Sequence, residues 1–413
     1  MDTLTRDVFV ELDRQDSLAG FRNQFELPAG HIYLNGNSLG VLPKAAKARA
    51  REVVDQEWGQ GLIRSWNSAD WINLPQRVGD RIAGLIGAEA GEVAVADSTS
   101  VNLFKLAAAA VKLRPGRSRI LSEPGNFPTD LYILQGLETF LDGKVQLSTV
   151  DRDEILAAMD EDTALVVLTH VHYKSGALFD MAAITRRAHE VGALVLWDLS
   201  HSTGAVPVAL NEANVDFAIG CGYKYLNGGP GAPGFLFVAE RHQAELQQPL
   251  SGWFGHANPF AMRDDYEPAE GIKRMLCGTT PVLGASLLEV GVDIMASADM
   301  SLIRDKSLRM GELFIELAEQ RLSEYGFGIA SSKDPAQRGS QVSLTHEQGY
   351  SIMQALISRH IIGDFRAPDI LRFGFAPLYV RYVDLWDCVQ AMAEIMANGE
   401  WDRAEYRKRT AVT

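Results

Sequence analysis

Short, strand-like apolar segments alternate with helical stretches through the middle of the chain, and most of them are continuous apolar runs rather than polar-alternating ones. The segments are residues 92–96, 118–122, 145–149, 164–169, 193–197, 217–220 and 234–238. Strands that are buried on both faces of a mainly parallel sheet lack the polar alternation of a half-exposed strand. The pattern therefore predicts an α/β domain, with a mainly parallel, seven-stranded-type sheet flanked by helices.

The pattern changes on either side of this region. Helical spacing is found at 44–58, 283–298 and 302–325, and the last part mixes strand-like and helix-like segments at 341–345, 350–358, 370–375 and 382–396. We predict a large domain over residues 61–282, and a smaller α+β domain formed by 1–60 and 283–413. Near the start, Asn35-Gly36 favours a turn, and Ser38 is predicted to cap the helix after it.

Composition narrows the class of protein. The 413 residues are 46% hydrophobic and 22% charged, which is ample for a large buried core. A net charge of −14 argues against a nucleic-acid or anionic-membrane partner, so any anion site must be local. The three cysteines have no metal-ligand spacing and suit a reducing compartment, and the start lacks the apolar segment of a signal peptide. We expect a soluble, cytoplasmic protein with no membrane contact.

One strand-like segment ends in a reactive type of residue. The segment that begins at Asp216 ends in Tyr223-Lys224, and a glycine-rich turn follows at 228–231. A lysine beyond a buried strand lies where charge is costly, so its neutral amine becomes available as a nucleophile. A solvated lysine in an ordinary loop is the alternative, and this stretch alone favours that alternative.

Polar residues follow other strands of the predicted sheet. Ser98, Thr99 and Ser100 come at a helix start, where hydroxyls and free amides hold a phosphate or simply cap the helix. Pro128 stiffens a turn that presents Phe127 as a flat face.

Further along, Asp198 and His201 follow the 193–197 strand. Ligands of parallel α/β sheets bind at the carboxyl ends of the strands, so these groups converge on one edge. A lysine, a buried carboxylate, an aromatic face and a helix N-terminus are together what a pyridoxal 5′-phosphate site requires.

The sequence also resembles the fold-type I pyridoxal phosphate enzymes of the class V aminotransferase group, and within them the kynureninase family. The matching stretches span nearly the whole chain: Tyr33-Leu-Asn-Gly-Asn-Ser-Leu-Gly40, Leu62-Ile-Arg-Ser-Trp-Asn67, Asn126-Phe-Pro-Thr-Asp130, Asp198-Leu-Ser-His201, Tyr223-Lys-Tyr-Leu-Asn-Gly-Gly-Pro-Gly231, Ser251-Gly-Trp-Phe-Gly-His256 and Leu371-Arg-Phe-Gly-Phe-Ala-Pro-Leu-Tyr379. Asn35 departs from the family, which more often has aspartate there, and the Gly278-Thr279 pair varies within it.

The resemblance implies a role for each matching residue. Lys224 would bind the cofactor covalently, Asp198 would pair with its pyridine nitrogen, and Tyr223 would carry a proton. The other implied cofactor contacts are Thr99, Ser100, Phe127, Pro128, Thr129, Asp130, Thr169, His201, Trp253 and Thr279. Arg372 matches the arginine that binds the substrate carboxylate, for which its planar fork is suited. Trp66, Phe254 and His256 are the other implied substrate contacts.

The implied activity is hydrolysis of L-kynurenine to anthranilate and L-alanine, or of its 3-hydroxy form to 3-hydroxyanthranilate and L-alanine. This reaction belongs to tryptophan catabolism through the kynurenine pathway and to NAD (pyridine nucleotide) biosynthesis. The family also implies a homodimer with shared active sites, in which Trp253 and Thr279 come from the partner subunit.

Two other functions remain open from the sequence. A cysteine desulfurase or selenocysteine lyase needs a mobile cysteine near the substrate, and Cys277 is the candidate because Cys221 and Cys388 lie within predicted elements. A regulator that binds the cofactor without turnover is disfavoured by the complete Lys224 and Arg372 motifs. We expect no metal site, since His170 and His172 lack a third ligand at a fitting spacing.

Overall fold

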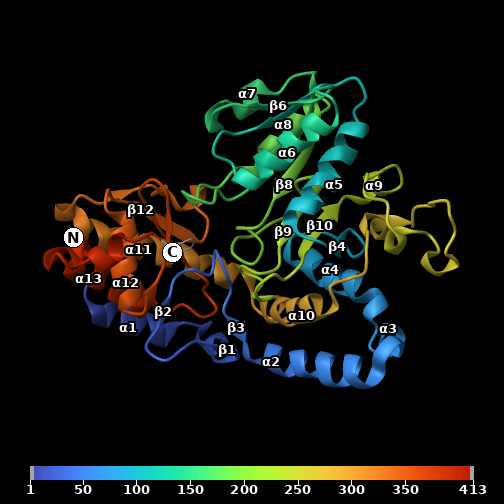
Figure 1. Cartoon of the computed structure of the whole chain (residues 1–413). Coiled ribbons are helices and arrows are strands. Elements are labelled where there is room, and N and C mark those ends of the chain that lie inside the picture. The colour runs from blue at the N-terminus through green and yellow to red at the C-terminus, as the bar shows by residue number, and fades with distance from the viewer. Residues whose placement is uncertain (1–3, 410–413) are drawn as a thin grey trace.

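A seven-stranded sheet forms the centre of the larger lobe in the computed structural model, which describes residues 4–409 (Figure 1). Its strands are β4 (Val93–Val95), β5 (Arg119–Ser122), β6 (Gln146–Thr149), β7 (Thr163–Thr169), β8 (Leu194–Asp198), β9 (Phe217–Cys221) and β10 (Gly234–Val238). They lie in the order β4-β10-β9-β8-β7-β5-β6. β10 is antiparallel to both of its neighbours, whereas the pairs from β9 to β6 are parallel. The predicted mainly parallel sheet is confirmed.

Helices cover both faces of this sheet, which explains the continuous apolar strands. Along β7, Leu165 and Val167 enter the core beneath α5 (Thr99–Lys112) and α6 (Pro128–Phe140). The alternate residues Val166 and Leu168 enter the core beneath α4 (Leu74–Leu85) and α8 (Met181–Glu190). Successive side chains on a strand point to opposite faces, so a strand covered on both sides must be apolar throughout. Two short helices complete this lobe, α7 (Ile155–Ala158) and α9 (Glu240–Gln243).

The smaller lobe contains both ends of the described chain and a four-stranded antiparallel sheet (Figure 1). Its strands, in spatial order, are β11 (Gly328–Ile329), β12 (Gln341–Thr345), β15 (Ile370–Gly374) and β14 (Asp364–Arg366). Its helices are α1 (Arg6–Gln15), α11 (Met300–Leu322), α12 (Gly349–Ser358) and α13 (Tyr382–Ala397). The pattern predicted β12, β15 and the three C-terminal helices, but it missed the short strands β11 and β14.

An N-terminal arm connects the two lobes. β2 (Ile32–Tyr33) pairs with β13 (Ile361–Ile362) of the small lobe, and β1 (Phe25–Glu26) pairs with β3 (Leu42–Pro43). The predicted helix over 44–58 is divided: α2 (Lys44–Arg51) is α-helical, and a π-helix continues it over Glu52–Gly61. A short helix, α3 (Ser65–Ser68), then leads into the large lobe, and α10 (Val282–Ala296) packs against α4 and α2.

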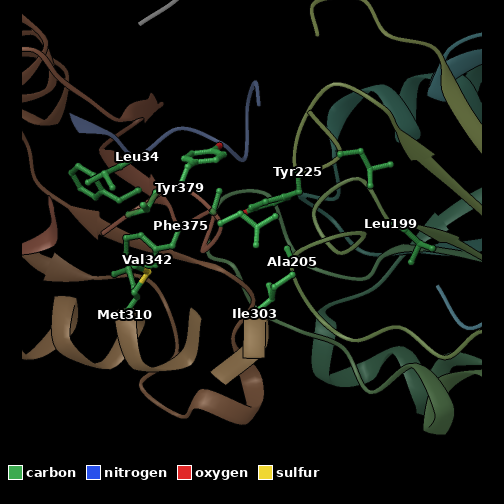
Figure 2. Packing of buried hydrophobic residues seen from close by; sticks show 14 of the residues in the cluster. Leu34, Leu199, Ala205, Tyr225, Ile303, Met310, Val342, Phe375 and Tyr379 are labelled. Atoms are coloured by element: carbon green, nitrogen blue, oxygen red, sulfur yellow. The ribbon is translucent and has the colours of Figure 1, made fainter. Parts of the chain in front are cut away.

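One apolar core is continuous between the lobes (Figure 2). Tyr225 and Ala205 of the large lobe lie in the same cluster as Ile303, Phe375 and Tyr379 of the small lobe. The hydroxyl of Tyr225 donates to the backbone carbonyl of Ser340 across this junction (3.1 Å). The chain just after β9 is therefore fixed where the two lobes meet. No helix within residues 4–409 has the length and apolar composition needed to cross a bilayer.

Candidate active site

The carboxyl ends of β7, β8 and β9 bring the predicted polar groups together. Thr169 and Asp198 lie directly opposite each other in the β7–β8 pair, at the last residue of each strand. Asp198 is in turn opposite Ile219 of β9, which ends at Cys221. Lys224 follows three residues later and is 9% exposed. A parallel sheet places these strand ends along one edge, as the sequence predicts.

Lys224 faces two aromatic rings. Its Nζ atom lies over the Phe127 ring, 5.8 Å from the centroid, and 5.9 Å from the centroid of the Tyr223 ring. The N-terminal arm closes on the same loop, because Gly40 donates its N–H to the carbonyl of Tyr223 (2.8 Å). A Cβ on Gly40 would lie 2.3 Å from the carbonyl oxygen of Lys224, so this approach requires glycine.

Tyr223 is a protonated phenol in this setting. Burial, and then the neighbouring Cys221 and Asp198, raise the pKa of Tyr223 above its ordinary value. The hydroxyl therefore retains its proton across the physiological range and is able to donate it. The local turn pattern did not distinguish this tyrosine from a spacer; the family resemblance singled it out.

Asp198 and Asp130 form a pair of buried carboxyl groups. Burial raises the pKa of both, and the Asp198 charge raises that of Asp130 further. Asp198 is stabilised as an anion by the Lys224 ammonium and by the hydroxyl and N–H of Ser200, at 2.6 and 2.8 Å. When two close carboxyl groups share limited cationic support, one retains a proton. We assign the anion to Asp198 and the proton to Asp130.

Thr169 and Asn126 hold this carboxyl pair in place. The Thr169 hydroxyl donates to Oδ1 of Asn126 (2.5 Å) and lies 3.4 Å from Oδ2 of Asp130. The same Asn126 oxygen accepts the N–H of Phe127 (2.8 Å), which fixes the turn before Pro128 and Thr129. Asn126 was not among the predicted site residues, although it opens the motif that contains four of them.

His201 is 3% exposed and lies close enough to Lys224 and Arg372 for their charges to affect it. Burial, and then the Lys224 ammonium, hold the pKa of His201 well below its usual value, so the imidazole is neutral. Its Nδ1 has no hydrogen-bond partner among residues 4–409. A buried ring nitrogen of this kind is available to a polar ligand in the same space.

The N-terminus of α5 lies next to this group. Gly234 is paired with Cys221 across β9 and β10, and a Cβ on Gly234 would lie 3.0 Å from the N atom of Thr99. The first N–H groups of a helix lack intrahelical partners, and the helix dipole favours an anion there. Thr99 and Ser100 add two hydroxyls, while Ser98 serves as the N-cap by accepting the N–H of Val101 (3.4 Å).

These residues fit the predicted pyridoxal phosphate. The carboxylate of Asp198 suits a protonated pyridine nitrogen, the face of Phe127 suits a flat ring, and the start of α5 suits a phosphate. The unpartnered Nδ1 of His201 gives a polar group on the ring a buried donor or acceptor. Lys224 supplies the amine for a covalent attachment.

Arg372 reaches the same junction from the small lobe. Its side chain is 2% exposed, and Nη1 donates to the carbonyl of Tyr173 in the large lobe (2.7 Å). Nη2 donates to Oγ of Ser38 in the N-terminal arm (2.7 Å) and to the carboxylate of Asp364. The prediction that Ser38 caps a helix is wrong, because its hydroxyl bonds Asp364 and Arg372 instead. Ser38 and Asp364 belong to strands and turns that are distant in sequence, so no local spacing identified them.

The remaining predicted residues form a second group. Trp66 contacts both Trp71 and Phe254, with ring centroids 5.9 and 5.8 Å apart, and Trp253 contacts Phe254 at 5.0 Å. Phe254 donates its N–H to the carbonyl of Cys277 (3.2 Å), which places this loop beside Gly278-Thr279. Trp253 is 37% exposed and Thr279 is also exposed. Residues 250–275 project from the large lobe on the side away from the small lobe (Figure 1).

His256 orders this second group rather than the Lys224 region. Its Nδ1 accepts the N–H of Asn258 (2.8 Å), its Nε2 lies 3.2 Å from the carbonyl of Asp265, and its ring contacts Tyr266. A hollow of about 230 Å³ beside it is lined by Trp253, Asn258 and Tyr266 among others. Within one chain the predicted substrate contacts therefore divide between the lobe junction and this outer loop.

Two family profiles match parts of the chain. The profile described as "Kynureninase C-terminal domain" covers residues 303–392, and that of the DegT/DnrJ/EryC1/StrS aminotransferase family covers residues 74–208. Among solved structures, a cysteine desulfurase from Thermococcus onnurineus NA1 superposes with a TM-score of 0.79 at 18% identity, covering 92% of this chain and 98% of that one. A cysteine desulfurase from Escherichia coli gives 0.74 at 18% identity, covering 92% and 99%. These similarities show the fold and confirm the predicted fold-type I architecture.

Full-length relatives define the family more closely. A protein named kynureninase from Burkholderia pseudomallei (strain 1106a) is 52% identical, covering 99% of this chain and all of the relative. Another with that name, from Pseudomonas fluorescens, is 51% identical over the same shares of the two chains. At this identity over the full length, with the Lys224 and Arg372 motifs in place, the chain belongs to the kynureninase family.

Proposed function

We propose that this protein binds pyridoxal 5′-phosphate at Lys224 and hydrolyses L-kynurenine to anthranilate and L-alanine. The observation that carries the proposal is the buried guanidinium of Arg372 at the same lobe junction as Lys224 and Asp198. Such an arrangement holds an amino-acid carboxylate beside a covalently bound cofactor. The 52% identity to proteins named kynureninase supports the choice of substrate.

The protein's own groups divide the work of binding. When bound, the cofactor withdraws electrons from the α-carbon of the amino acid and so weakens bonds around it. Asp198 keeps the pyridine nitrogen protonated, and the protonated state of Asp130 lets Asp198 stay anionic. The first turn of α5, with Thr99 and Ser100, holds the phosphate.

Proton transfer falls to the residues after β9. Lys224 would hold the cofactor, and its amine is the base that we expect to remove the proton from the α-carbon of the substrate. Hydrolysis of the bond between the β-carbon and the ketone carbon requires a water molecule and a proton for the new methyl group. Tyr223 retains its phenolic proton and lies beside Lys224, so it is the donor we assign to that carbon.

A cysteine desulfurase is the second candidate, because proteins with that activity share the fold. The cysteines argue against it. Cys221 and Cys388 are buried, and burial raises the pKa of the half-buried Cys277 thiol, which disfavours the nucleophilic thiolate. Cys277→Ser should leave kynurenine cleavage intact, whereas sulfide release from L-cysteine that disappears in this variant would support the rival.

Anthranilate fluorescence tests the proposal directly. The purified protein with pyridoxal phosphate should release anthranilate from L-kynurenine, and kinetics with 3-hydroxy-L-kynurenine would show which ring is preferred. If the protein binds the cofactor but turns over neither compound, the alternative of a non-catalytic regulator that binds pyridoxal phosphate would be favoured. We propose that the reaction serves tryptophan catabolism and pyridine nucleotide biosynthesis in the cytoplasm.

We also propose a homodimer with shared sites. The outer loop exposes Trp253 (37%), Phe260 (61%) and Met262 (73%), and the neighbouring segment exposes Leu62 (59%) and Ile63 (77%). An apolar face of this kind is typical of a subunit interface. A partner docked there would bring its Trp253 and Thr279 to the Lys224 group.

Mixing two inactive variants tests this arrangement. Lys224→Ala and Trp253→Ala homodimers, exchanged by mild denaturation and refolding, should regain activity, since one site of each mixed dimer is then unmodified. Light scattering of the wild-type protein should give the mass of two chains. If the mixture stays inactive while subunits demonstrably exchange, each site is built from one chain.

A further inference from the structure

Asp364 and Arg372 form a buried ion pair in the small lobe. They are directly opposite in the antiparallel pair β14–β15, so their side chains lie on the same face of the sheet. Both side chains are 2% exposed, and Nη2 of Arg372 donates to Oδ2 of Asp364. Burial is the main cause that lowers the pKa of Arg372; the Asp364 charge opposes that effect, and the Arg366 charge adds to it. The pair is too deeply buried to be an incidental surface contact.

The contacts of the Arg372 guanidinium fix its orientation. Nη1 is held by the carbonyl of Tyr173, and Nη2 is held by Ser38 and Asp364. Nε has no hydrogen-bond partner among residues 4–409 and is buried. A guanidinium held at both terminal nitrogens cannot rotate, so its Nε–H faces one defined direction.

Asp364 does not cancel the positive charge needed for an anionic ligand. Its Oδ2 also accepts the Ser38 hydroxyl (2.9 Å) and pairs with Arg366 (2.8 Å). The guanidinium groups of Arg372 and Arg366 together carry two positive charges, and the carboxylate of Asp364 carries one negative charge. One net positive charge therefore remains in this cluster. That charge is available to a substrate carboxylate, while Asp364 holds the nearer guanidinium still.

We propose that Asp364 is a positioning residue, which orients the Arg372 guanidinium so that it receives the α-carboxylate of the substrate. The inference rests on the proposed function for the identity of that carboxylate. It adds a residue that touches neither substrate nor cofactor and acts through Arg372. Ser38 makes the N-terminal arm part of the same arrangement.

Asp364→Asn keeps the shape and removes the charge. If Asp364 positions Arg372, this variant should raise the KM for L-kynurenine by about 10- to 100-fold, as expected when a binding group is displaced by about 1 Å. The value of kcat should change by less than about threefold, since the lost interaction is made equally in ground and transition states. If Asp364 instead competes with the substrate for Arg372, the Asp364→Asn variant should have a lower KM than the wild type. A lower KM or an unchanged KM would overturn the proposal.

A binding measurement separates positioning from a general structural role. L-alanine and L-alaninamide differ at the carboxylate, and their dissociation constants are obtained from changes in cofactor absorbance. In Asp364→Asn the preference for L-alanine should fall by about 10-fold or more. If the variant binds L-alanine and L-alaninamide more weakly by the same factor, the substitution has only damaged the structure, and the positioning role is wrong. This comparison needs no turnover, so it stands even if L-kynurenine proves not to be the substrate.

Two further variants complete the test. Asp364→Glu retains the charge but displaces the carboxylate by one methylene. It replaces Asp364→Asn in the test if the asparagine variant fails to fold. Positioning predicts a raised KM and a reduced preference for L-alanine in this variant too, whereas wild-type values would show that charge alone matters. Asp369→Asn, at the turn between β14 and β15, is the matched control and should behave as wild type.

Discussion

The amine of Lys224 lies over the face of Phe127, 5.8 Å from the ring centroid, although the two residues come from loops that follow different strands. Phe127 follows β5 and Lys224 follows β9, with β8 and β7 between them in the sheet. Asp198 and His201 both lie close enough to the Lys224 amine for its charge to shift their pKa values.

Replacing the lysine tests the covalent attachment. Lys224→Arg retains a cation but removes the nucleophilic amine, so turnover should fall by at least about 10³-fold. After borohydride reduction, mass spectrometry should find the cofactor attached to the Lys224 peptide of the wild type and absent from that of the variant. Lys112→Arg, at an exposed position, is the matched control. Cofactor attached elsewhere in the wild type would contradict the assignment.

The phenol of Tyr223 should matter for turnover and not for cofactor retention. Tyr223→Phe removes one positioned proton donor, which is worth about 10²- to 10⁴-fold in rate. Cofactor absorbance after gel filtration should match that of the wild type, because the ring contact with Lys224 is retained. Near-normal release of anthranilate by this variant would exclude Tyr223 as the proton donor.

The two buried carboxyl groups should respond differently to the same change. Burial and the Asp198 charge hold the pKa of Asp130 well above its usual value, so Asp130→Asn replaces one neutral group by another. Its effect on kcat should stay below about 10-fold, whereas Asp198→Asn removes the anion and should cost more than about 10²-fold. Comparable losses in both variants, measured at saturating cofactor, would mean that the proton is not on Asp130.

His170 should make the fold sensitive to acid. Burial is the main cause that lowers the pKa of this imidazole from 6.5 to about 4, while its Nδ1 lies 2.9 Å from Oγ of Ser202. The unfolded chain binds the proton more readily, so stability should decrease as pH falls from about 6.5 to about 4, by roughly 3 kcal/mol. His172 and His201 also have lowered pKa values, which adds to the effect in the same direction.

Urea unfolding between pH 4 and pH 7 measures this dependence. His170→Asn removes the titrating group and keeps a polar side chain near Ser202, so its stability should vary less with pH than that of the wild type. His31→Asn, in the N-terminal arm, is the control and should keep the wild-type slope. Parallel pH curves for wild type and His170→Asn would show that His170 is not responsible.

The large sheet was predictable because each strand carries its signal locally. A strand covered on both faces is largely apolar, and the seven segments correspond to β4 through β10. The edge strand β6 is the exception, because its Gln146 and Thr149 are exposed. Lys224, Asp198 and Phe127 could be selected because each follows such a strand and the carboxyl ends of parallel strands meet at one edge. The family resemblance supplied the roles, including that of Arg372.

What the sequence left undecided depends on contacts between distant segments. The short strand β14 has no distinctive pattern, and Asp364 meets Arg372 because of the register of two antiparallel strands. Ser38 lies too far before α2 to cap it, since that helix begins at Lys44, and its hydroxyl bonds the buried Asp364 and Arg372 instead. The protonated states of Asp130 and Tyr223 likewise follow from burial beside other charges.

The sequence by itself determined the layered α/β fold, the lysine and its strand-end neighbours, because strand burial and turn chemistry are local properties. The tertiary structure decided which groups lie at one edge of the sheet, which buried carboxyl has its pKa raised by the other's charge, and what holds Arg372. Those depend on distance and burial in three dimensions, and electrostatic interactions between buried groups change steeply with both.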